Sequence, residues 1–569
     1  MTSQLQHNEP LTPDGNYPAA RASLFAPLSH RTFRNVWVGS LFSHTGMLIQ
    51  GVGAAWAMTE MASANMVALV QTASFLPMML FSIPSGAFAD MFDRRNVQIT
   101  ALSLAFGAAC LMMLAAYLGL LTPWPLLFFC FLIGTAMSLF GPAWQSSTGE
   151  QVPSNVLPQA ITLNSAGYNV ARSVGPAIGG GIVALAGVGA AFGVNALCYL
   201  PLLVILWRWK RVKEPTRLPP ERISRAIVSG LRFLVYMQPA RKAVIRTAIS
   251  GLLGASIVAM MPLLARDVLS GDATTYGLLL GSFGIGSVIG ILYLGRLRVM
   301  GSEQLLRLLA VAMAVGLVAI AFTTHLLLAC LLLLVIGAAW TSMATTLNIA
   351  LQTWAPRWVV GRVVATFQAT MAGGIAVGSW IWGIVAEHAG PAQALWIAAI
   401  LFALTPFIGM LLPIEDRDNS EDDTAGSLVD PDIKLGISGR SGPISIAIEY
   451  RIAADRARDF YNLMQEVEQI RSRNGAYGWL LSRDLSDPEL WIERYWCPTW
   501  HDYLRQRNRS TAAELAIQQQ AIDLHIGLEP VQVRRMLERP YGSVRWRADT
   551  PDRGSGSHVA FAAADPARD

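Results

Sequence analysis

The stretch "SIPSGAFADMFDRRNVQ", Ser82–Gln98, places two acidic and two basic side chains within residues 90–95, between two long apolar runs. From Val97 to Gly149 the chain then contains no Lys, Arg, Asp or Glu. About 20 apolar residues are enough to cross a bilayer. Only 14% of the residues are charged, against roughly 25% in soluble proteins. The pattern predicts membrane-spanning helices, with this charged turn at the membrane surface.

Twelve such spans are predicted, so the expected fold class is an all-α membrane protein of two six-helix bundles with a C-terminal α+β domain. The expected centres of the spans are Gly46, Leu76, Ala109, Thr135, Gly175, Tyr199, Leu253, Gly284, Met313, Ile336, Ile375 and Leu401. The predicted divisions are a tail (1–30), a first bundle (31–208), a basic linker (209–241), a second bundle (242–413), an acidic linker (414–440), a domain (441–548) and a tail (549–569).

Basic residues gather in every second connection between spans, whereas the other connections hold essentially only Arg266. Because Lys and Arg stay on the inner side of a membrane, both termini are expected in the cytoplasm of a bacterial cell. The first 30 residues show no apolar core of a signal peptide. The formal charge of +5 and the five cysteines without a CxxC pair predict no nucleic-acid partner, metal, disulfide framework or cofactor.

The charged turn resembles the major facilitator superfamily signature Gly-x-x-x-Asp-(Arg/Lys)-x-Gly-(Arg/Lys)-(Arg/Lys). The matching residues are Gly86, Asp90, Arg94 and Arg95. Met91 and Asp93 replace a basic residue and a glycine of the signature. The resemblance covers roughly Arg31–Pro413. It implies a carrier that alternates between two open states, in which this cluster closes the cytoplasmic side of the outward-open state.

Each residue of the turn has a physical role that fits this expectation. Gly86 would let two helices approach closely. Asp90 can accept hydrogen bonds from the N-terminus of a neighbouring helix, and Arg94 can pair with Asp90 or Asp93. The alternative is a basic stop signal that only fixes topology, a part that Arg94 and Arg95 play in either case.

The two predicted bundles resemble each other. "GAFADMFDRR" is echoed by "GILYLGRLR", Gly290–Arg298, at a similar place in the second half. "AWQSSTGEQVPSNVLPQA" is likewise echoed by "ALQTWAPRWVVGRVVA". Duplication of a six-helix unit is typical of transporters built from repeats.

A glycine-rich span contains a second motif. Its residues are Gly175, Pro176, Gly179 and Gly180. Proline kinks a helix and glycines allow close packing. The motif resembles the antiporter motif of superfamily exporters, although Ala171 stands where its longer form has another glycine. The resemblance implies a bent seal against leakage.

Arg172 lies near the middle of the same span, where a charge is costly and faces a cavity or a partner. It could bind an anionic substrate group or tune a nearby protonation. Alternatively, it could hold helices together through carbonyls and Asn164 or Asn169. His44 could carry a coupling proton, or form a packing hydrogen bond. No acid occupies the middle of any span, so the coupling ion stays open, with proton coupling expected.

The strings "ITLNSAGYNVARSVGPAIGG" and "WAMTEMASANMVALVQTASFLP" look closest to the bacterial exporter branch that contains enterobactin exporters. This resemblance implies export of a small, siderophore- or drug-like molecule across the inner membrane. The rival hypotheses are uptake by the same fold, and a membrane-tethered enzyme or sensor. No GxxxxGK[ST] loop is present, so ATP is not expected to drive transport directly.

The region after the acidic linker reads as βαββαβ, with strands at "PISIAIEYRI", "AYGWLLSRD", "ELWIERYW" and "SVRWRA" and a first helix ended by Gly475. It resembles the dimeric domains of antibiotic-biosynthesis monooxygenases, which implies a possible homodimer. Trp479, Trp500, His501 and Arg505 could line a pocket, but no nucleophile–base pair is visible. The chain is therefore not expected to be an enzyme.

Overall fold

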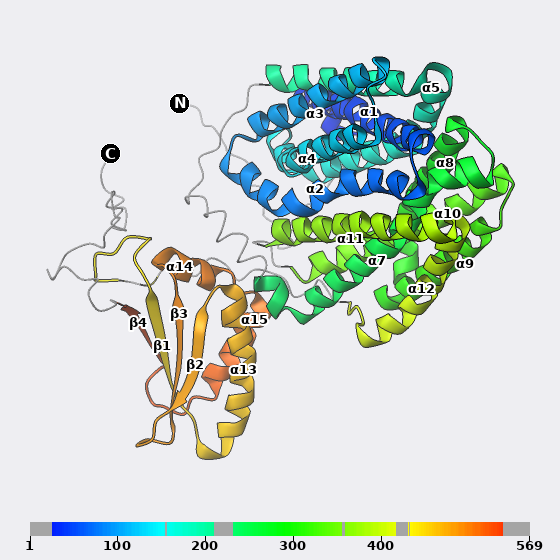
Figure 1. Cartoon of the computed structure of the whole chain (residues 1–569). Helices are drawn as coiled ribbons and strands as arrows, with labels where there is room; N and C mark the ends of the chain where they lie inside the picture. Colours follow the sequence, from blue (N-terminus) through cyan, green and yellow to red (C-terminus); the bar gives the residue numbers. More distant parts are fainter. Residues whose placement is uncertain are drawn as a thin grey trace, which may run out of the picture.

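The computed structural model describes residues 25–153, 156–209, 232–355, 359–416, 431 and 433–538, without the side chains of residues 87, 89–91, 512 and 513. Figure 1 shows a large helical body beside a small α/β domain. The tails and linkers predicted at the ends of the chain and between the domains lie largely outside the described residues.

The first bundle consists of helices that alternate in direction. They are α1 (Arg31–Met61), α2 (Ala64–Met91), α3 (Arg94–Tyr117), α4 (Pro123–Ser147) and α5 (Leu157–Arg208). Short connections join them, as expected for neighbouring antiparallel helices.

Helix α5 is two helices joined at Gly187. Its 52 residues would extend about 78 Å at 1.5 Å per residue, more than twice a hydrocarbon core of about 30 Å. Gly187 has φ 81° and ψ 172°, a conformation that glycine adopts without strain. Residues on both sides of Gly187 pack on α1, the first half parallel to it and the second half antiparallel. The chain therefore reverses direction at Gly187.

The second bundle follows the undescribed part of the basic linker. Its helices are α7 (Gln238–Leu263), α8 (Ala273–Leu297), α9 (Ser302–Ala321), α10 (Leu326–Thr353), α11 (Val360–Ala389) and α12 (Pro391–Leu411). Helix α7 continues into a π-helical turn, Leu264–Val268. Asp272 then caps α8 by accepting a hydrogen bond from the backbone nitrogen of Thr275.

In the described part of the chain, ten helices are long and apolar enough to cross a membrane. Helix α5 counts once among the ten, and α1 is not one of them. The prediction of a helical, multi-span membrane protein is confirmed at this level.

Two pairs of helices join the bundles: α2 packs against α11, and α5 packs against α8 (Figure 1). We call the end of the helical body that carries Phe92 and Asp93 the turn end, and the end that carries Ala62 and Gly390 the far end. Both pairs are antiparallel, because α2 and α8 begin at the far end whereas α5 and α11 begin at the turn end.

The C-terminal domain has a four-stranded antiparallel sheet in the order β2-β3-β1-β4. Its elements are β1 (Ile444–Arg451), α13 (Ala457–Asn474), β2 (Tyr477–Arg483), β3 (Leu490–Cys497), α14 (Trp500–Asn508), α15 (Ala512–Asp523) and β4 (Gln532–Leu537). The predicted order of strands and helices is confirmed, with the second helix broken in two. Gly475 ends α13 in a left-handed conformation, as expected.

The described sheet is completed by a strand that the sequence did not predict. "SVRWRA" lies outside the described residues, and the closing strand is β4, which pairs with β1 from Glu449 to Ile444. Two consecutive arginines, Arg534 and Arg535, interrupt the apolar alternation of β4. Arg535 still faces the helices, because its Nε donates to the hydroxyl of Tyr503 at 2.7 Å.

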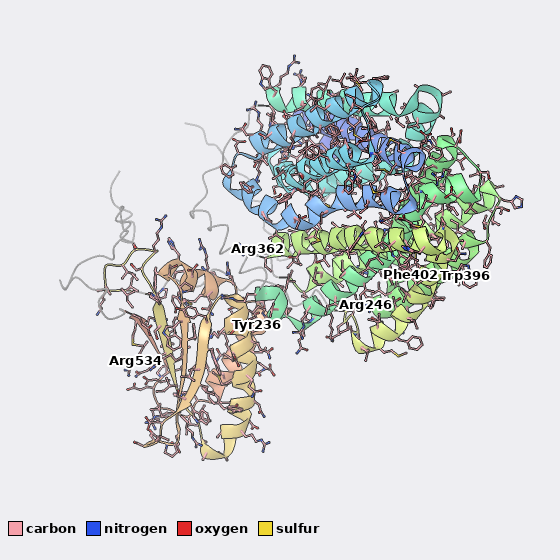
Figure 2. The ribbon with its side chains drawn as sticks, in the orientation of Figure 1. Tyr236, Arg246, Arg362, Trp396, Phe402 and Arg534 are labelled. Carbon is pink, nitrogen blue, oxygen red and sulfur yellow. The ribbon has the colours of Figure 1, made fainter. Side chains whose placement is uncertain are left out.

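The domain lies at the turn end, against the segment that precedes α7. Arg473 Nη1 contacts the sulfur of Met237 at 3.2 Å, and Arg232 Nη1 donates to the carbonyl of Ala476 at 3.5 Å. Phe233 and Leu234 of the same segment are buried in the core of the helical body. The neighbouring Tyr236 is labelled beside the domain in Figure 2.

Candidate functional site

The charged turn between α2 and α3 is built around Asp93. Its carboxylate accepts a hydrogen bond from the backbone nitrogen of Arg95 at 3.0 Å and so caps α3. The side chain of Asp90 lies outside the described residues. No described atom lies within 4 Å of a Cβ built on Gly86. The close helix approach expected at Gly86 is therefore absent from this conformation.

Arg94 connects the turn to the segment after α4. Its Nη1 donates to Glu150 Oε1 at 2.9 Å and to the carbonyl of Ser146 at 3.0 Å. The sequence predicts only Asp90 and Asp93 as partners of Arg94, and Glu150 was not predicted. The available signal was that Glu150 is the one acid of a connection predicted on the same side of the membrane.

Arg95 caps the end of α5. Its Nε donates to the carbonyl of Leu206 at 2.7 Å, and its Nη2 donates to that of Trp207 at 2.6 Å. A cation is favourable there, because the last carbonyls of a helix lack backbone partners and carry partial negative charge. The two arginines thus join α3 to two other parts of the first bundle.

Three hydrogen bonds join the bundles at or toward the far end. Arg266 donates to the carbonyl of Thr59. The other two are Ser63 Oγ to Glu387 Oε2 at 3.2 Å, and Thr72 Oγ1 to the carbonyl of Ala376 at 2.8 Å. The far end is therefore closed by contacts between the bundles.

The glycine motif of α5 packs against two different helices. Cβ atoms built on Gly175 and Gly179 would lie 3.0 Å from Leu48 and Ile49 of α1. A Cβ on Gly180 would lie 2.5 Å from the carbonyl oxygen of Ala273 and 3.0 Å from the Cα of Gly277, both in α8. The motif therefore permits close approach of α5 to both neighbours.

Helix α8 carries the complementary glycines, which were not predicted from the sequence. A Cβ on Gly277 would lie 2.7 Å from the carbonyl oxygen of Pro176, and one on Gly284 would lie 2.6 Å from that of Arg172. Gly281 lies between them on the same face and also meets α5. Their spacing of four and three residues is the signal that could have identified this face.

Beyond these glycines, α5 and α8 separate toward the turn end. Ile161 and Ser165 of α5 and Leu292 and Gly295 of α8 continue the contacting faces, and all four are exposed. Among the glycines of α8, Gly284 is the last one whose Cβ would meet α5, at Arg172 and Ser173. The helices thus touch at the far end and diverge from the level of Arg172.

Arg172 lies at this level with its guanidinium over the ring of Phe283 in α8, 5.4 Å from the ring centroid. It is partly exposed, and its guanidinium forms no hydrogen bond or ion pair with a described residue. Asn164 donates to Thr148 Oγ1 at 3.1 Å, and Asn169 donates to the carbonyl of Ser165 at 2.9 Å. In this conformation neither asparagine forms a hydrogen bond with Arg172.

His44 packs against aromatic rings. Its ring lies edge-to-face with Trp144 of α4 and Tyr168 of α5, at centroid distances of 5.4 and 5.2 Å. Within the described residues neither ring nitrogen forms a hydrogen bond. In this conformation both nitrogens are thus available for a proton or a ligand.

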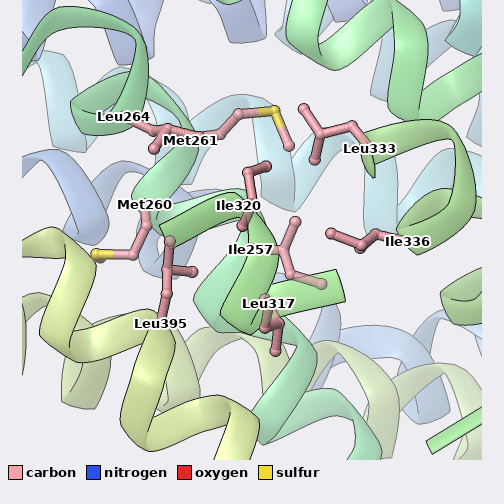
Figure 3. A pocket seen from close by; sticks show the side chains of 9 residues that line it. All are labelled: Ile257, Met260, Met261, Leu264, Leu317, Ile320, Leu333, Ile336 and Leu395. Carbon is pink, nitrogen blue, oxygen red and sulfur yellow. The ribbon is translucent and has the colours of Figure 1, made fainter. Parts of the chain in front are cut away.

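The apolar hollow in the second bundle is too small to be a substrate site. Nine side chains line it, including Met260, Met261 and Leu395 (Figure 3). Its volume is about 10 Å³, which is no more than the space of one water molecule.

The four residues considered for a C-terminal pocket do not converge. Trp479 Nε1 donates to the buried carboxylate of Glu493 at 3.1 Å, whereas Trp500 packs against Tyr503. Burial and the nearby Arg505 lower the pKa of His501 below its ordinary value. No group of three potential metal ligands occurs among the described residues.

The chain matches, over residues 22–541, the profile of a major facilitator family described as a transmembrane secretion effector. The chain belongs to this family. The match continues through β4 of the C-terminal domain.

Two curated relatives are bacterial transporters. The multidrug efflux pump Tap of Mycolicibacterium fortuitum is 26% identical over 363 residues, which cover 62% of this chain and 88% of that protein. The staphyloferrin A transporter of Staphylococcus aureus is 23% identical over 361 residues, which cover 62% and 89%.

Solved structures of transporters share the fold. A bacterial homologue of the human lysosomal transporter Spinster, in an inward-facing and unoccupied conformation, aligns with a TM-score of 0.55 and 12% identity, over 70% of this chain and 98% of its own. A mutant of the nucleoside transporter NupG aligns with a TM-score of 0.55 and 13% identity, over 67% of this chain and 100% of its own. The protein is a multi-pass membrane transporter, and its fold and relatives are not those of enzymes.

The glycine contact between α5 and α8 predicts that Gly180→Val opens the far end. The added side chain would clash with Ala273 and Gly277, whereas Gly181→Val is the matched control because no atom lies within 4 Å of a Cβ at Gly181. Spin labels at the exposed Leu120 and Thr324, in a variant without native cysteines, report the separation of the bundles there. We expect Gly180→Val to add a longer distance to the distribution and Gly181→Val to leave it unchanged. An unchanged distribution in Gly180→Val would show that the contact does not hold the far end closed.

Proposed function

We propose that this protein is a secondary active exporter of a small, amphipathic molecule, working by alternating access in the bacterial inner membrane. The observation that carries the proposal is the asymmetry between α5 and α8, which touch through glycines at the far end and separate toward the turn end. A carrier needs such a contact, closed at one end and able to open when the bundles rock against each other.

The proposed topology has twelve spans with both termini in the cytoplasm. The two halves of α5 are each long enough to cross a bilayer, and α1 has 31 residues. With these, the ten apolar helices become twelve spans. Arg94 and Arg95 favour a cytoplasmic position for the turn end, and in this proposed topology a conformation open toward the turn end is inward-facing.

Export is favoured by the glycine–proline motif and by the relatives, one a multidrug efflux pump and the other a staphyloferrin A transporter. A siderophore- or drug-like cargo is consistent with the descriptions of both relatives. For coupling we propose a proton carried by His44, because its ring nitrogens are unpaired within the described residues and its ring is partly exposed.

The export proposal is tested by comparing cells that lack their own copy and carry the wild type, Gly180→Val or Gly181→Val at equal membrane levels. We expect a compound that accumulates in the medium with the wild type and Gly181→Val. With Gly180→Val its accumulation falls about tenfold, since 1.4 kcal/mol of bias between two states changes their ratio tenfold. Mass spectrometry measures the amount of the compound in the medium and in the cells.

Two outcomes contradict this proposal in different ways. A compound that disappears from the medium only with the wild type would establish uptake instead of export. Equal metabolite levels in wild-type cells and in cells with an empty vector, including cells loaded with a set of drugs, would argue against secretion altogether.

We also propose that the C-terminal domain pairs with a second copy, as its resemblance to dimeric monooxygenase domains implies. The sheet face opposite α13 carries Leu480 and Met536, which are 50% and 42% exposed. A second sheet would bury these side chains.

Light scattering of the purified full-length chain in detergent tests this pairing. We expect a dimer in the wild type and a monomer in Leu480→Glu/Met536→Glu. Leu485→Glu is the matched control, because Leu485 is fully exposed in the turn between β2 and β3. A monomeric wild type, or a dimer that survives the double substitution, would refute it.

A further inference from the structure

We infer that Arg172 forms a binding subsite for a cargo that carries an oxyanion, such as a carboxylate, next to a flat ring. This inference rests on the proposed transport function and names the substrate class. Its starting observation is that Arg172 is partly exposed at the level where α5 and α8 separate, with no hydrogen-bond or ion-pair partner among the described residues.

Arg172 lies midway along the first half of α5, fifteen residues from both Leu157 and Gly187. At 1.5 Å per residue this is about 22 Å from either end. A charge at such a depth is costly unless it faces a partner or a cavity. The ring of Phe283 covers one face of the guanidinium, but it satisfies none of its five N–H donors.

The acidic side chains of the first bundle that the structure describes have partners other than Arg172. Glu150 pairs with Arg94, Glu60 accepts a hydrogen bond from Trp56, and Asp93 caps α3. The planar fork of an arginine matches the two oxygens of a carboxylate, and such charged pairs are stronger than neutral hydrogen bonds. The counter-charge that fits this site is therefore an oxyanion supplied by the cargo.

The surroundings of Arg172 specify the rest of the cargo. Tyr168 lies one turn toward the turn end on the same face of α5 and is 38% exposed. Its ring meets that of His44, which in turn meets that of Trp144. A cargo that enters from the turn end would thus pass aromatic rings before its oxyanion reaches the guanidinium. Planar apolar groups pack well against such rings.

The subsite also involves both bundles. Arg172 belongs to α5 and Phe283 to α8, and the carbonyl of Arg172 is packed against Gly284. When α5 and α8 part at this level, the guanidinium loses the ring of Phe283. The affinity for an oxyanion then differs between the two states, which is what a ligand requires in order to shift their populations.

The test is calorimetric titration of the purified full-length chain in dodecyl maltoside. The probes are 2-naphthoate, its neutral analogue 2-naphthylmethanol, and inorganic phosphate. The variants are Arg172→Gln and Arg172→Lys. The matched control is Arg296→Gln, because Arg296 also lies over an aromatic ring, that of Tyr293, but is exposed near the end of α8.

We expect the wild type and Arg296→Gln to bind 2-naphthoate about tenfold or more tightly than the other two probes, as a hydrogen bond to a charged group would give. Arg172→Gln should bind 2-naphthoate no better than 2-naphthylmethanol. Arg172→Lys should keep part of the preference, since it retains the charge without the fork. The spin-label distances at Leu120 and Thr324 must match those of the wild type, so that a loss of folding is recognised.

Three results would overturn the inference: equal affinity of the wild type for 2-naphthoate and 2-naphthylmethanol, a preference that survives in Arg172→Gln, or phosphate binding as tightly as 2-naphthoate. The last would mean a site for a free inorganic ion. If cells still export a compound while the anion preference is absent, this inference fails and the proposed function stands. If the purified protein prefers the anion but cells export no compound, the anion subsite stands and the proposed export function fails.

Discussion

The close approach of α5 to α8 is the contact on which the rest of the structure depends. Within a membrane the hydrophobic effect does not draw helices together, so close packing of small residues must do so. Gly180 and Gly277 bring the two backbones together, and Gly284 extends the contact as far as Arg172. Because this interface is made of van der Waals contacts, the helices can part without leaving buried ion pairs unpartnered. The same interface is therefore a seal and a point of separation.

The turn end complements this contact by making the first bundle one rigid body. Arg94 bonds to the segment after α4 and Arg95 bonds to the end of α5, so these hydrogen bonds couple α3 to both. Rigid bundles that rock about a central site are the expected basis of alternating access. Arg172 lies at that central level, which is where a cargo must be reached from either side. The C-terminal domain contacts the segment before α7 and hence the second bundle.

The sequence predicted the helices and strands better than it predicted which of them contact each other. The apolar runs predicted the helices, the glycine motif predicted close packing, and the alternating strands predicted the order of the C-terminal domain. Periodicity shows which residues share a face, but not which helix that face meets. Glu150 is 56 residues from Arg94, and no local pattern joins them. The ring of Phe283 beneath Arg172 likewise depends on how the two bundles dock. Strand β4 was not predicted, because consecutive arginines hid its alternation, although one of them reaches Tyr503.

The central claim is that the far end must open for transport to occur. Ser63 and Glu387 join the two bundles there, with their side-chain oxygens 3.2 Å apart. Cysteines at these two positions, joined by a short bifunctional thiol reagent, would hold the far end closed. Efflux of the exported compound should then stop and recover when the link is cleaved. The same link between cysteines at Tyr117 and Gly189, which are in contact within the first bundle, should leave efflux intact. Undiminished efflux from the Ser63–Glu387 cross-linked protein would contradict the account.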